Sequence, residues 1–202
     1  MSLSYLQPVE ASFTLDDYKP QQVGFQIQKH LYSIGLPDLS DVKIAFFCVE
    51  KNRQSFSNFR RHLYSLFVGN WYFSIADLGN LPAGETDEDT HFAIREIVAE
   101  LVKKGVIPLV IGGEQQFTYS LYRAFDSLEQ MVNLVSVDAK FDFGNEEELF
   151  IESIQDRVAR FVIGTYSDEN SLTAGSETIY ISTSQMIGRF RSKFPVELRK
   201  MT

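Results

Sequence analysis

The chain has 202 residues, of which 44% are hydrophobic, so it is long enough for a domain with a buried core and too apolar to be disordered. Its formal net charge of -8 is a poor match for nucleic acid, because affinity for phosphate backbones comes from clustered Lys and Arg. No apolar run approaches the roughly 20 residues that cross a bilayer, residues 1–10 lack the pattern of a signal peptide, and one cysteine cannot form an internal disulfide. We therefore expect a soluble, cytoplasmic protein that binds neither nucleic acid nor a membrane.

Residues 1–40 carry little hydrophobic patterning and are interrupted by prolines and glycines. We predict an N-terminal arm that lies on the rest of the protein, within which residues 21–32 could form a helix. The domain itself is predicted to take residues 41–202.

Residues 42–49 are nearly all apolar and predict a buried strand. Residues 53–69 follow with a helical period, in which Phe56, Phe59 and Leu63 share one apolar face. A further strand is expected over residues 71–78, and a polar loop over residues 79–89. The next helix has the strongest pattern, because Thr86 offers a capping oxygen and Gly105 suits the end of a helix.

The remaining chain continues the alternation of strands and helices. Residues 106–111 and 131–137 predict buried strands, with a short helix beginning near Phe117 between them. A helix is expected over residues 146–160, and strands over residues 161–163 and 178–182. Strands that are apolar on both faces and are separated by amphipathic helices indicate an α/β fold, with a mostly parallel sheet and helices on both faces.

Several polar residues stand outside any motif. A basic cluster is interpreted as the solvated face of a helix rather than a surface for nucleic acid; it comprises Lys51, Arg53, Arg60, Arg61 and His62. The three histidines, His30, His62 and His91, are interpreted as surface or helix-face residues.

Three further side chains each have a structural and a functional interpretation. Cys48 lies inside an apolar strand, which favours a buried structural thiol over a nucleophile, for which a paired histidine is not evident. Tyr119 and Tyr122 fall on the helix after residue 117. Packing explains them most simply, and contact with a ligand is the alternative.

Two strand ends carry polar clusters, and ligands of open α/β sheets bind beyond the carboxyl ends of strands. One cluster is residues 112–116, GGEQQ, and the other is residues 138–144, DAKFDFG. In an extended chain Asp138, Lys140 and Asp142 point to one side, because side chains alternate. A local ion cluster at the end of a strand would also explain this pattern.

Together these segments resemble the ureohydrolase superfamily of arginases, agmatinases and formiminoglutamases. That family carries Gly-Gly-Asp-His-Ser at one strand end and Asp-Ala-His-x-Asp at the next, about two dozen residues later. Here IGGEQQFTYSLYRAF stands in the first place and VSVDAKFDFG in the second. FRRHLYSLF, DLGN and RFVIGT resemble further segments of the family, so the resemblance covers roughly residues 42–182.

The resemblance implies an arginase-like three-layer α/β sandwich and a pair of manganese ions that activate a hydroxide. This chain departs from the family at the metal ligands. Gln115 stands where the first histidine would be and Lys140 where the second would be, while Asp138 and Asp142 remain. No later Asp-x-Asp pair follows. We therefore expect no bound manganese, no cofactor and no catalytic residues, with these four positions as a vestigial site.

Our leading hypothesis is a ureohydrolase-like pseudoenzyme that acts as a scaffold or binds a small cationic or amide-bearing ligand. The alternative is an active, formiminoglutamase-like C–N hydrolase with an altered metal site. The chain is short for the family, so it is also possible that it is incomplete and that further ligands belong to a longer parent. We expect self-association, because part of a larger fold would leave a sheet edge or an apolar face uncovered.

Overall fold

The computed structural model describes residues 2–10, 12–13, 18–51, 55–70, 74–113 and 117–128 in full, and the backbone of residues 132–137, 158–165 and 178–182. The chain forms two compact units, Met1–Leu128 and Glu129–Thr202. Both are built on parallel sheets, so the predicted α/β class is confirmed. Among the described residues no helix is both long and apolar enough to span a membrane.

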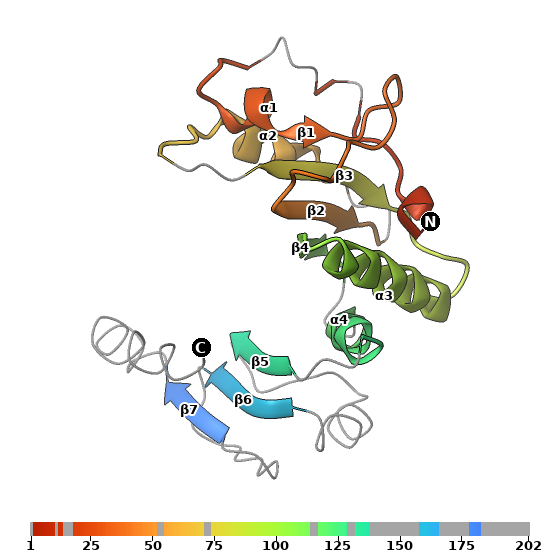
Figure 1. Ribbon diagram of the computed structural model, residues 1–202, viewed down its shortest axis with the longest axis vertical. Helices are drawn as coiled ribbons and strands as arrows, with labels where there is room; N and C mark the ends of the chain where they lie inside the picture. The colour runs from red at the N-terminus through yellow and green to blue at the C-terminus, as the bar shows by residue number, and fades with distance from the viewer. Residues whose placement is uncertain are drawn as a thin grey trace. The chain divides into compact units, whose positions relative to one another are not determined.

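The first unit contains a four-stranded sheet in the order β1-β3-β2-β4, in which every pairing is parallel (Figure 1). The strands are β1 (Gln28–Lys29), β2 (Ile44–Val49), β3 (Ile75–Leu81) and β4 (Ile107–Gly112). The strands predicted over residues 42–49 and 106–111 are therefore confirmed. Parallel strands end at the same edge of a sheet, so β2, β3 and β4 deliver the residues that follow them to one place.

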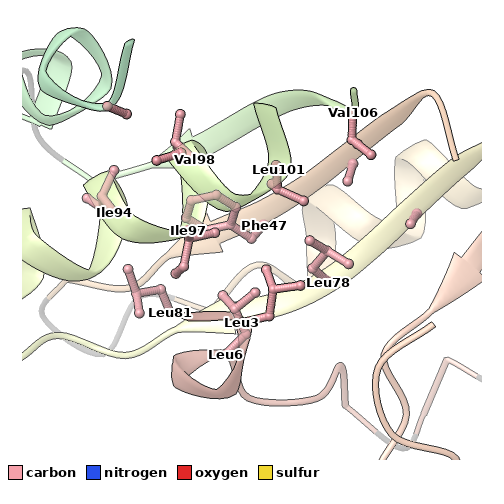
Figure 2. Close-up of a cluster of buried hydrophobic side chains, with 14 of the residues drawn as sticks. Leu3, Leu6, Phe47, Leu78, Leu81, Ile94, Ile97, Val98, Leu101 and Val106 are labelled. Carbon is pink, nitrogen blue, oxygen red and sulfur yellow. The ribbon is translucent and has the colours of Figure 1, made fainter. Parts of the chain in front are cut away.

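Helices cover both faces of this sheet. One core layer contains Leu78 of β3, Phe47 of β2 and the side chains of α3 (Asp87–Lys103), joined by Leu3 of the short 3-10 helix η1 (Ser2–Tyr5) and by α4 (Phe117–Asp126). Figure 2 shows Ile97 and Leu101 of α3 pointing toward Phe47 and Leu78. The opposite layer packs Phe46 and Cys48 of β2 against α2 (Ser57–Ser65) and α1 (Val23–Gln26).

Helix α3 begins and ends where its sequence predicts. The Thr86 side chain accepts the backbone N–H of Asp89 at 3.2 Å, and the Asp89 carboxylate accepts the backbone N–H of Thr86 at 3.0 Å. This reciprocal capping box satisfies two N–H groups that the first helical turn leaves free. After Lys103, Gly105 takes a φ of 72° and turns the chain toward β4.

The second unit contains β5 (Val132–Val137), β6 (Val158–Thr165) and β7 (Thr178–Ser182), paired in parallel in that order. The strands predicted over residues 131–137, 161–163 and 178–182 are confirmed. The helix predicted over residues 146–160 is wrong at its end, because residues 158–160 already belong to β6. The rest of that predicted helix lies outside the described residues.

The N-terminal segment, which was predicted to be an arm, contributes a strand and several buried side chains to the first unit. The helix predicted over residues 21–32 is wrong beyond Gln26, because Gln28 and Lys29 pair with Ala76 and Asp77 as strand β1. Leu3, Leu6 and other apolar side chains upstream are buried. Local composition cannot anticipate this pairing, because the partner strand lies nearly 50 residues later in the sequence.

The strand predicted over residues 71–78 lies further along the chain, at residues 75–81. The polar loop predicted over residues 79–89 is wrong at both ends, because β3 continues to Leu81 and α3 begins at Asp87. In the structure Gly79 is a bulge within β3, with a φ of 92°. A Cβ at this position would overlap the backbone oxygen of Gln7, which crosses β3 here and bridges to Asn80.

Substituting alanine at Gly79 is expected to destabilise the protein much more than the same change at Gly105. Both glycines have a positive φ, so both changes carry backbone strain of about 1–2 kcal/mol. Gly105 has no atom within 4 Å of an added Cβ, whereas Gly79→Ala also collides with Gln7, which raises its expected cost to about 2–5 kcal/mol. Urea unfolding of the two variants measures the difference. Equal decreases in the free energy of unfolding would show that the N-terminal segment does not pack against β3.

Candidate functional site

The four predicted site positions, Gln115, Asp138, Lys140 and Asp142, lie outside the described residues. The strands that precede them are defined. β4 ends at Gly112, three residues before Gln115, and β5 ends at Val137, the residue before Asp138. Sequence reasoning therefore placed both polar segments correctly after the carboxyl ends of strands.

Two consecutive glycines lead the chain out of β4. Gly112 and Gly113 have φ values of 81° and 78°, a backbone conformation that other residues rarely adopt. A Cβ on Gly112 would overlap the ring of Phe56, and one on Gly113 would overlap the ring of Phe117. The double glycine thus serves both the turn and the close packing of two aromatic rings at the edge of the sheet.

His91 of α3 anchors the first turn of α4, which follows the segment that carries Gln115. Its Nδ1 lies 2.5 Å from the Ser120 hydroxyl, and its ring meets the Phe117 ring edge-on at 5.0 Å. His91 is half-buried on a helix face and His62 is exposed on α2, as predicted. His30 is not a surface residue, because it is buried and its Nδ1 lies 3.0 Å from the carbonyl oxygen of Leu78.

The remaining single residues behave as packing residues. The Cys48 thiol is fully buried, and burial raises its pKa from 9.0 to about 12, which disfavours the nucleophilic thiolate. The rings of Tyr119 and Tyr122 stack with centroids 6.5 Å apart, and Tyr122 is buried. Both interpretations made from the sequence agree with these positions.

Arg60 does not belong to a solvated basic face, which corrects the interpretation made from the sequence. Its side chain is 1% exposed, and it binds the fully buried carboxylate of Asp77 with two hydrogen bonds. Nε donates to Oδ2 at 2.6 Å and Nη2 to Oδ1 at 3.1 Å. Burial by itself lowers the pKa of Arg60, but hydrogen bonding and charge from Asp77 raise it above its usual value.

A tyrosine completes this buried cluster. The Tyr64 hydroxyl donates to Asp77 Oδ2 at 2.5 Å. Burial and the neighbouring carboxylate both raise the pKa of Tyr64, so it stays a hydrogen-bond donor. The sequence signal that would have found the cluster is the spacing of Phe56, Arg60 and Tyr64, which places Arg60 between two aromatic residues on one helix face.

The ion pair also shapes the bulge of β3. Asp77 Oδ1 accepts the backbone N–H of Gly79 at 2.8 Å, and Arg60 Nη2 donates to the Gly79 carbonyl at 3.0 Å. The register of β3 against β2 shifts at this point. As a result Leu78 and Leu81 both enter the core layer beneath α3, and Asn80 pairs with Cys48, whose side chain lies in the α2 layer.

The bulge brings Asn80 next to Glu50 at the carboxyl ends of β3 and β2. Asn80 Nδ2 donates to Glu50 Oε1 at 2.6 Å, and the Glu50 backbone N–H donates to the Leu81 carbonyl at 2.9 Å. Asn80 is 8% exposed and Glu50 is half-buried. Within the described part of the chain, Asn80 Oδ1 is the one buried side-chain N or O atom that has no hydrogen-bond partner.

Acidic side chains gather at the start of α3. Glu85 precedes this helix, and its first turn contains Asp87, Glu88 and Asp89. Lys51, the residue after Glu50, lies 3.8 Å from Asp87, which places this turn next to the residue that follows Glu50. Among the residues that the structure describes, no three His, Cys, Asp or Glu side chains are grouped so that they could hold a metal ion.

Comparison with known proteins identifies a family. The sequence profile described as "Arginase family" matches residues 38–189. The structure of formimidoylglutamase from Bacillus subtilis is similar with a TM-score of 0.61 and 18% identity, over 82% of this chain and 64% of that chain. Agmatine ureohydrolase of Thermoplasma volcanium gives a TM-score of 0.61 and 17% identity, over 94% of this chain and 71% of that one.

Two further similarities involve a mutated relative and a protein of another kind. One similar structure is a triple mutant of the T. brucei arginase-like protein, solved bound with Mn²⁺, in which Asp, His and Asp replace Ser, Arg and Ser. It has a TM-score of 0.53 and 14% identity, over 94% of this chain and 66% of that chain. One component of the ATP-dependent helicase/deoxyribonuclease of Lactococcus lactis is 80% identical over 77 residues, which are 38% of this chain and 7% of that protein. A match to so small a share of a long protein does not carry its activity to this chain.

Replacing Asp77 with asparagine is expected to destabilise the protein by about 3–5 kcal/mol, because the change leaves the Arg60 guanidinium buried without its partner. Glu96→Gln is the matched control: Glu96, whose side chain is 39% exposed, pairs with Arg95 at 3.1 Å, and its loss should cost no more than about 1 kcal/mol. Urea unfolding measures both values. A loss below about 1 kcal/mol for Asp77→Asn would contradict the buried pair described above.

Proposed function

Because the chain belongs to the arginase family, we propose that it is a ureohydrolase-like domain that does not perform manganese-dependent hydrolysis. It acts instead as a scaffold or as a binding domain for a small ligand. The observation that carries this proposal is Lys140, which stands where the family's second histidine would be, together with Gln115 in the place of the first.

The chemistry of these donors does not fit a pair of manganese ions. A protonated lysine has three N–H donors and no lone pair to offer a metal, and a glutamine oxygen is a neutral, weak ligand. At about 4 Å and an effective dielectric near 20, each unit of like charge costs on the order of 4 kcal/mol. Lys140 therefore opposes a dication at the position where an imidazole would bind it.

The T. brucei arginase-like protein offers a parallel. The similar structure bound with Mn²⁺ is that of a mutant in which a histidine replaces an arginine and two aspartates replace serines. A basic residue was thus exchanged for an imidazole in that protein, and Lys140 represents the opposite exchange relative to the family's motif. This parallel supports the proposal that the native chain lacks a functional manganese site.

The proposed ligand is small and cationic or amide-bearing. Acidic residues support a cation over an anion, because Glu50 follows β2 and the first turn of α3, which Lys51 contacts through Asp87, contains three further acids. Self-association of the chain stays a prediction, for which light scattering is the direct measurement.

Purified protein that has been incubated with manganese and then desalted is expected to retain far less than two manganese ions per chain. It is also expected not to hydrolyse arginine, agmatine or formiminoglutamate. Elemental analysis and an assay for released urea or formamide check the two results. About two manganese ions per chain would overturn the proposal and favour the alternative, a formiminoglutamase-like hydrolase that uses an altered site around Asp138 and Asp142.

The double variant Gln115→His with Lys140→His is expected to gain manganese affinity without gaining hydrolysis. The change supplies two imidazole ligands and removes one positive charge. Removal of the charge alone is expected to raise the manganese affinity roughly a thousandfold, because one like charge costs about 4 kcal/mol. The two changes alone are not expected to give activity, since no Asp-x-Asp pair follows Asp142 within these 202 residues. Isothermal titration with manganese, with Gln116→His as a control for an added histidine, tests this directly. Equal affinity in wild type and double variant would contradict the role assigned to Lys140.

A further inference from the structure

The pair formed by Glu50 and Asn80 contains a polar atom that the fold itself does not satisfy. Asn80 is more than nine-tenths buried, and its amide nitrogen is taken up by Glu50 Oε1. Its Oδ1 has no hydrogen-bond partner among the described residues. Buried carbonyl oxygens nearly always accept a hydrogen bond from protein, water or a ligand, so this exception at the carboxyl edge of a sheet marks a place where a bound group can donate.

The orientation of the Asn80 amide follows from chemistry. A carboxylate only accepts hydrogen bonds, so the atom of Asn80 that lies 2.6 Å from Glu50 Oε1 must be the N–H donor. The amide oxygen therefore faces away from that bond. Glu50 keeps a second carboxylate oxygen, Oε2, and its side chain is half-buried, so the pair can be reached from solvent at Glu50.

We propose that Glu50 and Asn80 together bind the protonated nitrogen of a small organic cation. This inference rests on the ligand-binding part of the proposed function and not on the loss of hydrolysis. The N–H groups of the cation donate to Asn80 Oδ1 and to the Glu50 carboxylate. Neither Glu50 nor Asn80 is one of the vestigial metal positions.

The surroundings select a cation that carries N–H donors. Asn80 Oδ1 and Glu50 Oε2 are both oxygen acceptors, and a hydrogen bond from a charged donor is about twice as strong as one from a neutral donor. The first turn of α3, whose Asp87 lies 3.8 Å from Lys51, the residue after Glu50, contains three acidic side chains, which repel anions and attract cations. Lys51, the basic neighbour, lies 3.8 Å from Asp87, whose carboxylate compensates its charge.

Nuclear magnetic resonance titration of the ¹⁵N-labelled full chain tests the site. Methylammonium and methylguanidinium are the two probes, and tetramethylammonium, which has no N–H group, is the control at equal ionic strength. The backbone signals of Glu50 and Leu81 and the side-chain amide of Asn80 are expected to shift saturably with one or both probes. Tetramethylammonium is expected to leave these signals in place. The two probes decide whether an ammonium or an amidinium-type group is preferred.

Two variants assign the binding to the pair. Asn80→Leu and Glu50→Gln are each expected to weaken binding about tenfold or more, because each removes a hydrogen bond to a charged group. Glu85→Gln removes the same charge from an exposed acid just before α3 and is expected to change the affinity less than about threefold. If Asn80→Leu does not fold, Glu50→Gln carries the test alone, with the unchanged dispersion of its spectrum as the sign of a native fold.

The outcomes separate this site from the broader proposal. Saturable binding that neither variant weakens would place the cation elsewhere, which overturns the site and leaves the proposed ligand-binding function standing. Shifts that tetramethylammonium reproduces, or no shifts with either probe, would also overturn the site and leave the Asn80 oxygen to a water molecule. Manganese content, measured separately, decides the loss of hydrolysis.

Discussion

The buried ion pair between Arg60 and Asp77 determines how the first sheet ends. Removing two charges from water is costly, and such a pair persists only where its other hydrogen-bonding groups are satisfied. Here the Tyr64 hydroxyl and both backbone groups of Gly79 complete it. The pair therefore ties α2 to β3 and at the same time holds the β3 backbone in a bulge.

The bulge decides which side chains meet at the carboxyl edge. In a regular strand Asn80 would share a face with Leu78 and would place an amide in the apolar layer beneath α3. The extra residue moves Leu81 into that layer and turns Asn80 to the side of Cys48 and Glu50. One polar contact beneath α2 thus keeps the opposite core apolar and creates the polar pair at the edge.

The parts of the fold that depend on short stretches of sequence were predictable. β2, β4 and β5 are apolar runs, and α3 is bounded by a capping box and a glycine, so local pattern was enough. Three features depend on contacts between distant segments and were not predicted. They are the pairing of Lys29 with Asp77, the packing of the Gln7 backbone against Gly79, and the burial of Arg60. For Arg60, its charge was given more weight than its helical phase, which matches that of Phe56 and Tyr64.

The same distinction between local patterns and long-range contacts explains which polar residues the sequence could identify. Gln115 and Lys140 were recognised because each sits within a short motif that follows a strand. Glu50 and Asn80 were not, because no spacing in the sequence relates the end of β2 to a bulge in β3 that is itself held by a side chain from α2. Binding groups that arise from a backbone irregularity become visible only when the register of the strands is known.

The separation between these two sets of residues bears on how a family member could persist without its metal. The polar anchor of the first unit is formed by Arg60, Asp77 and Tyr64, and none of these three residues belongs to the two motifs that carry Gln115 and Lys140. A cluster of carboxylates that has lost its cation is strained by like-charge repulsion. We propose that, without manganese, the ammonium of Lys140, two residues from Asp138 and from Asp142 in the sequence, supplies the charge that compensates these carboxylates. On this proposal the loss of the imidazoles and the gain of the lysine belong together, because the first weakens metal binding and the second compensates the carboxylates when no metal is bound.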